Sequence, residues 1–303
     1  MSKNIIFPYV TFNKFVDEPL LKKLSLFYDK ILVSESRFSI LEDASKKELK
    51  EEFKELHYEY SVWQYLNENN VVSKYNNFND INDSSDDIKE LQDLMMSVVR
   101  NNNTDIKTAD EKIQPLIKFY LSHDILARID TLKFRKSDEL NEYYSSLRNF
   151  GTFNTESKKN QVIQFILNDI PEPNNSTSWE QIIEYRSDLD VKNKYLALMN
   201  WINKVSNSNM KLSEIKDEYD YLYNDYMQQF KLHKMKYNNS KLEVILNATV
   251  NFITNISTGN YTTSIKDLFQ FNVKNAQLLQ EEAKLSGKEL AYIYHTSLKF
   301  KNE

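Results

Sequence analysis

The stretch EPLLKKLSLFYDKILV, residues 18–33, decides how the chain begins when it is read together with IIFPYV, residues 5–10. Leucines and aromatic residues recur at helical spacing through residues 20–28, and residues 30–33 then form a β-branched run. IIFPYV is a short apolar run with a proline, which is compatible with an edge strand. The order strand, helix, strand predicts a β-α-β unit at the start of the chain.

Helical periodicity dominates most of the remaining sequence. Ser45 with Glu48 and Thr108 with Glu111 have the spacing of capping boxes, in which each side chain bonds the other residue's backbone N–H. Apolar stripes predict helices at residues 45–63, 88–98, 108–132, 140–147, 212–234, 242–256 and 264–285.

The C-terminal stretch ELAYIYHTSL, Glu289–Leu298, is rich in tyrosine and predicts a strand that pairs with the N-terminal strands. The expected fold class is therefore mainly α, a multi-helix domain with a small β-sheet formed by N- and C-terminal segments. IPEPNNSTS, Ile170–Ser178, is the clearest break in the pattern. It predicts an N-terminal strand-helix-strand plus helical region at 1–170 and a C-terminal helical region at 171–303, unless the two form one continuous domain.

Composition excludes several kinds of chemistry. The 303 residues include 3 glycines, spaced too widely for a glycine-rich phosphate loop, and no cysteine that could form disulfides or thiolate metal sites. We expect no cofactor. The start of the chain lacks the apolar core of a signal peptide, and no run approaches 18 apolar residues, so we expect a cytoplasmic protein without membrane contact. The net charge of −5 disfavours nucleic acid as a partner without excluding it.

The densest polar cluster is SWEQIIEYRSDLD, Ser178–Asp190, which places Glu180, Glu184 and Asp188 at intervals of four. These carboxylates could face water in a first helical turn, contact a partner or hold a metal ion. Three ligands on one straight helix seldom converge, because positions i and i+8 lie about 12 Å apart. The pattern therefore favours a solvated helix start and no metal, while Trp179 beside the carboxylates keeps a partner contact open.

A second pair of candidate residues is His123 and Arg128, in the predicted helix at 108–132. Asp124 and Arg128 have the i,i+4 spacing of an ordinary helical ion pair. The alternative is that His123 and Arg128 line a pocket, which would require them to be buried.

The most basic stretch is KLHKMKYNNSK, residues 231–241. Cations are electrostatically favoured at a helix C-terminus without any ligand. Contact with phosphate or nucleic acid is the alternative for its basic residues Lys231, His233, Lys234 and Lys236.

Five blocks of this sequence are similar to blocks in a loose group of uncharacterised bacterial proteins: IIFPYVTF, LLKKLSLFYDKILV, PEPNNSTSWEQIIEYRSD, LHKMK and GKELAYI. The resemblance covers most of the chain. It implies a bacterial or mobile-element origin and one shared architecture. It carries no activity and no site residues, because none of these blocks is a catalytic signature.

Three hypotheses about function follow. The first is a non-enzymatic protein-interaction subunit of a bacterial cytoplasmic assembly, in antiviral defence or a mobile element, that binds another protein or itself. The chain contains 19 Tyr, 17 Phe and 3 Trp, and aromatic residues are enriched at protein interfaces. The second is an enzyme or nucleotide sensor with a site assembled from distant segments. The third is nucleic-acid binding through Lys231–Lys241, and whether the protein is an enzyme stays open.

Overall fold

The computed structural model describes residues 2–7, 18–35, 38–39, 42–43, 54–76, 85–100, 106–107, 109–145, 157–236, 282 and 284–300. The chain divides into two units. Unit 1 consists of Met1–Thr155 and Glu172–Ile183, and unit 2 consists of Glu156–Pro171 and Glu184–Glu303. The chain therefore crosses from one unit to the other three times.

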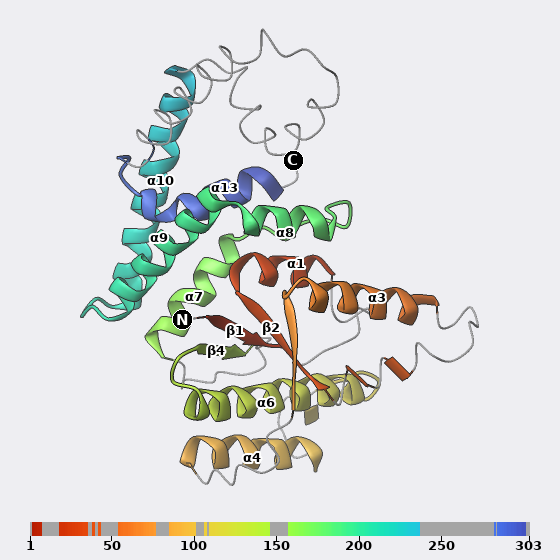
Figure 1. The fold of residues 1–303 in the computed structure, drawn as a ribbon. Helices are drawn as coiled ribbons and strands as arrows, with labels where there is room; N and C mark the ends of the chain where they lie inside the picture. The colour runs from red at the N-terminus through yellow and green to blue at the C-terminus, as the bar shows by residue number, and fades with distance from the viewer. Residues whose placement is uncertain are drawn as a thin grey trace, which may run out of the picture. The chain divides into compact units, whose positions relative to one another are not determined.

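Unit 1 is built on a parallel four-stranded sheet in the order β3-β2-β1-β4 (Figure 1). Its strands are β1 (Lys3–Ile6), β2 (Lys30–Ser34), β3 (Val72–Tyr75) and β4 (Glu142–Ser145). In the register, Ile5 of β1 lies opposite Ile31 on one side and Tyr144 on the other. Strands β1 and β2 are almost completely buried, as inner strands of a parallel sheet are when helices cover both faces.

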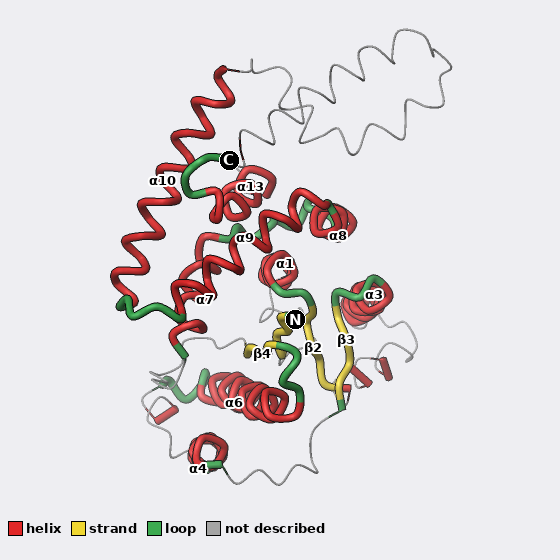
Figure 2. The backbone as a smooth tube through the Cα atoms, turned by 60° about the vertical axis from the view of Figure 1, so that its left-hand side comes forward, coloured by secondary structure: helices red, strands yellow, loops and turns green. Residues whose placement is uncertain are grey.

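The helices of unit 1 cover both faces of this sheet. Helices α1 (Glu18–Phe27) and α3 (Lys54–Glu68) lie on one face, and α6 (Gln114–Ser137) lies on the other, with α4 (Asp86–Val99) packed outside α6 (Figure 2). Right-handed crossovers account for this arrangement. The chain steps outward from β1 to β2 to β3 and then returns past β1 to β4, so the helix of the return connection covers the opposite face.

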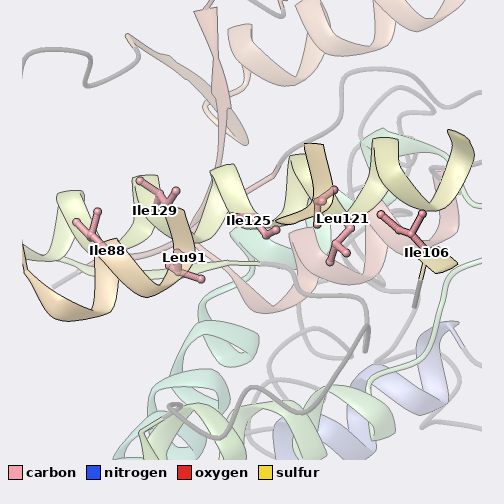
Figure 3. Packing of buried hydrophobic residues seen from close by; sticks show 7 residues of the cluster. Ile88, Leu91, Ile106, Leu121, Ile125 and Ile129 are labelled. Carbon is pink, nitrogen blue, oxygen red and sulfur yellow. The ribbon is translucent and has the colours of Figure 1, made fainter. Parts of the chain in front are cut away.

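Helix α6 has an apolar surface on two sides. Ala127 packs in one cluster with Ile6 of β1 and Tyr143 of β4. A second cluster joins α6 to α4, as Figure 3 shows for Leu91 of α4 and Ile125 of α6. The helix is therefore held between the sheet and α4.

Unit 2 contains α7 (Lys158–Asp169), α9 (Leu189–Ser206), α10 (Leu212–Lys236), a short 3₁₀ turn η3 (Lys288–Leu290) and α13 (Ala291–Phe300). Helix α8 (Trp179–Ser187) begins in unit 1 and ends in unit 2. Helix α10 contacts α7 and also the η3–α13 segment, so its apolar residues are covered by more than one neighbour. The helix predicted at 212–234 is thus confirmed.

Two buried tyrosines of α10 donate hydrogen bonds to carboxylates, one of them exposed and the other buried. The Tyr219 hydroxyl donates to Asp169 at 2.6 Å, and the Tyr226 hydroxyl donates to Glu282 at 2.7 Å. Burial, followed by the negative charge and the hydrogen bond of the neighbouring carboxylate, raises the pKa of both phenols far above the usual value. Both hydroxyls therefore stay protonated in the folded chain.

The predicted fold class is right in outline, because the described chain is mostly helical with a small sheet. The prediction that residues 140–147 form a helix is wrong. Leu140 is 80 % exposed, so the Leu140–Tyr144 spacing does not mark a buried helical face. Tyr143 packs against Phe134 of α6, whereas Tyr144 packs against Tyr28, and alternation between the two faces defines a strand.

The predicted C-terminal strand is also wrong, because Glu289–Leu298 falls in η3 and α13. Four consecutive residues, Ala291–Tyr294, are buried, so neighbours surround this segment. A helix satisfies its backbone N–H and C=O groups internally in such surroundings. The Thr296 hydroxyl also donates to the backbone oxygen of Tyr292, one turn earlier, at 2.7 Å. Packing therefore outweighs the β-propensity of the Tyr, Ile and Thr side chains.

Two further expectations need correction. The first strand is not an edge strand, since β1 pairs with both β2 and β4 and ends before Pro8. The helix predicted from Thr108 begins at Gln114, with Pro115 in its first positions. The capping box at Ser45 and the helix at 242–256 lie outside the described residues. Within the described part of the chain, no helix is both long and apolar enough to cross a membrane.

Gly287 is the one described glycine, and it lies directly against the backbone of α10. Its φ of 73° is in the left-handed region, and a Cβ built on it would lie 2.1 Å from the backbone oxygen of Leu222. Both the conformation and the contact require a residue without a side chain.

We expect Gly287→Ala to lower the free energy of unfolding by at least about 2 kcal/mol, measured by urea denaturation followed by circular dichroism. Gly287→Asn separates the two causes, because asparagine tolerates positive φ yet still carries a Cβ. It should be nearly as destabilising. The exposed Lys284→Ala should change stability by less than about 0.5 kcal/mol. An asparagine variant as stable as the wild type would show that the close approach to Leu222 has no cost.

Candidate functional site

Helix α8 begins at Trp179, directly after Ser178. The Ser178 backbone N–H donates to Gln181 Oε1 at 2.9 Å, and the Gln181 N–H donates to Ser178 Oγ at 3.3 Å. This reciprocal pair is a capping box and satisfies two N–H groups at the helix start. It fixes the position of Trp179 and Glu180, which follow Ser178 in the first turn.

The three carboxylates do not form one stripe. Glu180 belongs to unit 1, whereas Glu184 is an exposed residue of unit 2. Helix α8 ends at Ser187, and Asp188 is the N-cap of α9, where its side chain accepts a hydrogen bond from the Val191 N–H at 3.0 Å. Among the described residues, no group of three or more His, Cys, Asp or Glu is placed to hold a metal ion.

Trp179 and Glu180 line a pocket of about 370 Å³ that lies within unit 1. Its volume is in the range of small-ligand sites. The remaining lining comes from the first turns of α1, from α3 and from the loop before α8: Glu18, Lys22, Tyr58, Ser61, Val62, Tyr65 and residues 175–178.

One wall of the pocket contains a buried ion pair. The ammonium of Lys22 lies 2.9 Å from a carboxylate oxygen of Glu18, with the two side chains 1 % and 17 % exposed. The same nitrogen lies 5.5 Å from the centre of the Trp179 ring. A buried ammonium needs such partners, because desolvation costs several kcal/mol per ion. Glu18 therefore neutralises Lys22, the one cation among the described residues of the lining.

The rim of the pocket carries tyrosines bonded to carboxylates. The Tyr58 hydroxyl donates to Glu18 at 3.2 Å, and burial followed by the charge of Glu18 raises the pKa of this phenol. Tyr65 donates in the same way to Glu180. Hydrogen bonds to Glu180, first from its own backbone N–H and then from the Ser178 hydroxyl, lower the pKa of its carboxyl. Glu180 is therefore ionised at neutral pH.

Trp179 itself is 6 % exposed, and its indole N–H makes no hydrogen bond to any residue that the structure describes. Buried hydrogen-bond donors without a partner are uncommon in folded proteins. The loop that leads into Trp179 is held by Asn174, whose Oδ1 accepts from the backbone N–H groups of Ser176 and Thr177 at 2.9 and 3.0 Å. This Asx turn fixes the loop that contributes residues 175–178 to the pocket lining.

His123 and Arg128 do not form a shared pocket wall. Five residues apart on α6, they point about 140° away from each other around the helix. The Nδ1 of His123 lies 2.6 Å from the backbone oxygen of Phe119, and the two rings are 4.0 Å apart. Arg128 is 9 % exposed and adjoins Ala127, which packs on the sheet. The pocket hypothesis required both side chains to be buried. Arg128 is buried, but His123 is only half-buried.

Of the basic residues, Lys231 is exposed on α10. The backbone of α10 continues to Lys236, so the helix includes His233, Lys234 and Lys236. Their side chains, and the rest of the stretch to Lys241, lie outside the described residues.

Sequence reasoning missed a buried polar cluster in unit 2. Glu282 accepts hydrogen bonds from Tyr226 at 2.7 Å and from His295 at 2.9 Å, and it lies 3.3 Å from the ammonium of Lys194, which also pairs with Asp190. Burial tends to raise the pKa of Glu282, but His295, Lys194 and Tyr226 outweigh it and lower that pKa to about 2. No local pattern could reveal the cluster, because its members are far apart in the sequence.

The strand order of unit 1 defines the class of fold. Parallel sheets ordered 3-2-1-4 belong to the open α/β sheets, in which ligands bind beyond the carboxyl ends of the strands where the order reverses. Here that point lies between β1 and β4, and the residues that directly follow there, 8–17 and 146–156, are outside the described part of the chain. Comparison of the chain with family models, with curated proteins and with solved structures finds no match.

The buried ion pair predicts an asymmetry between two substitutions. Glu18→Gln leaves the Lys22 ammonium buried without a counter-charge and should cost about 3 kcal/mol of unfolding free energy. Lys22→Met removes the buried charge, keeps a similar volume and should change stability by less than about 1 kcal/mol. Urea denaturation at pH 7 measures both. Equal losses for the two variants would mean that Lys22 stabilises unit 1 by the pairing itself.

The Glu282 cluster predicts a loss of stability in acid. Its carboxyl pKa falls from 4.5 to about 2 on folding, so its stabilisation is present above about pH 4.5 and disappears as the pH falls towards 2. The full contribution is about 3 kcal/mol. Glu282→Gln should lower stability at pH 7 and flatten the pH dependence below 4.5, whereas the exposed Asp217→Asn on α10 should follow the wild type. An unchanged acid limb in Glu282→Gln would rule the cluster out as its cause.

Proposed function

We propose that this chain is a non-enzymatic interaction subunit of a bacterial cytoplasmic assembly, and that the pocket around Trp179 is its contact site for another protein. The observation that carries the proposal is the composition of this pocket. A buried tryptophan, whose N–H makes no hydrogen bond within the described part of the chain, lines one cavity with two tyrosines and two carboxylates. A role in antiviral defence or in a mobile element belongs to the same proposal and rests on the sequence resemblance.

The chemistry of the pocket favours an anchor contact. Tryptophan and tyrosine are enriched among the few residues that dominate the binding energy of protein interfaces, because they combine a large apolar area with a polar end. Tyr58 is 55 % exposed, so a partner can cover its ring, while Trp179 of the same lining is already buried. Because the Trp179 ring is already held in place, it loses little conformational entropy on binding.

A small-molecule site at the carboxyl edge of the sheet is the second candidate function. The strand order favours it, since open sheets of this kind place ligands where the order reverses. The scarcity of glycine argues against a phosphate-cradling loop there. A ligand at this edge would change the mass of the isolated chain without adding a second protein.

The test is native mass spectrometry of the tagged chain isolated from the cells that produce it. We expect a stable complex heavier than the 36.0 kDa chain by the mass of a second protein. Tyr58→Ala, which removes an exposed ring from the pocket, should reduce the recovered partner about tenfold or more. Tyr221→Ala is the matched control, because this tyrosine of α10 is 67 % exposed and does not line the pocket.

A bare 36.0 kDa mass would overturn the interaction proposal, and a mass raised by a small ligand would favour the second candidate. Equal loss of the partner in Tyr58→Ala and Tyr221→Ala would remove the pocket from the interface.

A further inference from the structure

The charges that line the Trp179 pocket are not balanced. Among the residues that the structure describes, two carboxylates, Glu18 and Glu180, and one cation, Lys22, line it. Lys22 is 1 % exposed and its ammonium is already paired with Glu18 at 2.9 Å. Glu180 is exposed, and its hydrogen-bond partners, Ser178 and Tyr65, are neutral. Within this described lining, the charge that has no oppositely charged partner is therefore negative.

The aromatic rings in the pocket suit the same kind of ligand. Tyr58 and Tyr65 donate their hydroxyls to carboxylates, so these hydroxyls are engaged while the rings remain part of the lining. A cation over such a ring is attracted by the negative face of its π-system, and a nearby carboxylate adds charge attraction. The Trp179 ring already shows this interaction with Lys22.

We infer that the pocket binds a cationic side chain, arginine or lysine, presented by the partner protein. This deepens the proposed function and rests on it. The guanidinium or ammonium group lies against the tyrosine rings with Glu180 as its counter-charge, and the aliphatic stem of the side chain fills the pocket above Trp179. A protein segment is the occupant that fits, because Glu180 and Tyr58 are both exposed at the rim, where a polypeptide can reach them.

An anionic ligand on Lys22 is the opposite possibility, and the geometry disfavours it. An anion would have to approach a nearly inaccessible ammonium that Glu18 already neutralises. It would also lie beside the ionised Glu180, and two like charges about 4 Å apart repel strongly at the surface of a protein.

The experiment uses the indole N–H signals of the ¹⁵N-labelled full chain, one for each of its 3 tryptophans. The Trp179 signal is assigned as the one missing in Trp179→Phe. The probes are the N-acetyl methylamides of arginine, lysine, citrulline and glutamate. Arginine and lysine should shift the Trp179 signal but not those of Trp63 and Trp201, and higher salt should weaken the effect. Citrulline, which matches arginine in shape without its charge, should leave the signal in place.

Glu180→Gln should weaken arginine binding about five- to tenfold. Glu184→Gln is the matched control, four residues later on the same helix, exposed and outside the pocket lining. It should bind like the wild type. Equal shifts by arginine and citrulline, a larger shift by glutamate, or no shift by any probe would overturn the inference.

Two further outcomes separate this inference from the proposed function. A protein partner lost in Tyr58→Ala but retained in Glu180→Gln would keep the contact site and overturn its preference for a cation. Spermidine that shifts the Trp179 signal at lower concentrations than the arginine probe would identify a free amine as the occupant and overturn the assignment to a protein segment.

Discussion

The position of β1 between two parallel neighbours is the constraint on which unit 1 depends. Because β2 and β4 both pair with β1, the chain must leave on one side of the first strand and return on the other. Right-handed crossovers then assign α1 and α3 to one face and α6 to the opposite one. Helix α6 covers the sheet and also receives α4, which is why its apolar residues surround much of the helix.

The same arrangement explains where the pocket forms. Helices α1 and α3 lie on one face of the sheet, and residues 175–180 complete the pocket that they line. The charge of Lys22 is tolerated within this wall because Glu18, one turn earlier on α1, is its partner. The pocket thus depends on short-range features, namely an i,i+4 ion pair, a capping box and an Asx turn, that the fold brings together.

The sequence predicts features that arise within one element. The β-α-β beginning, the long amphipathic helix α10 and the capping box of α8 are all recognisable from local spacing. Sequence spacing does not distinguish a helix from a strand where contacts with the rest of the fold determine which of the two forms. Leu140 and Tyr144 have helical spacing but form no common buried face, and the β-prone residues of α13 are enclosed by neighbours. The sequence also singles out Trp179 and Glu180, whereas Glu18, Tyr58 and Tyr65 join them only through tertiary packing.

The tyrosine–carboxylate pairs of α10 have a consequence for alkaline conditions. Tyr219 and Tyr226 have strongly raised phenol pKa values in the folded chain, so their neutral forms stabilise it up to the unfolded value of about 10. Above that pH the unfolded chain releases these protons while the folded chain keeps them, and stability declines. Ionisation of the two phenols and unfolding of unit 2 therefore become one coupled event. These two hydroxyl groups thus contribute to the upper pH limit of the stability of this unit.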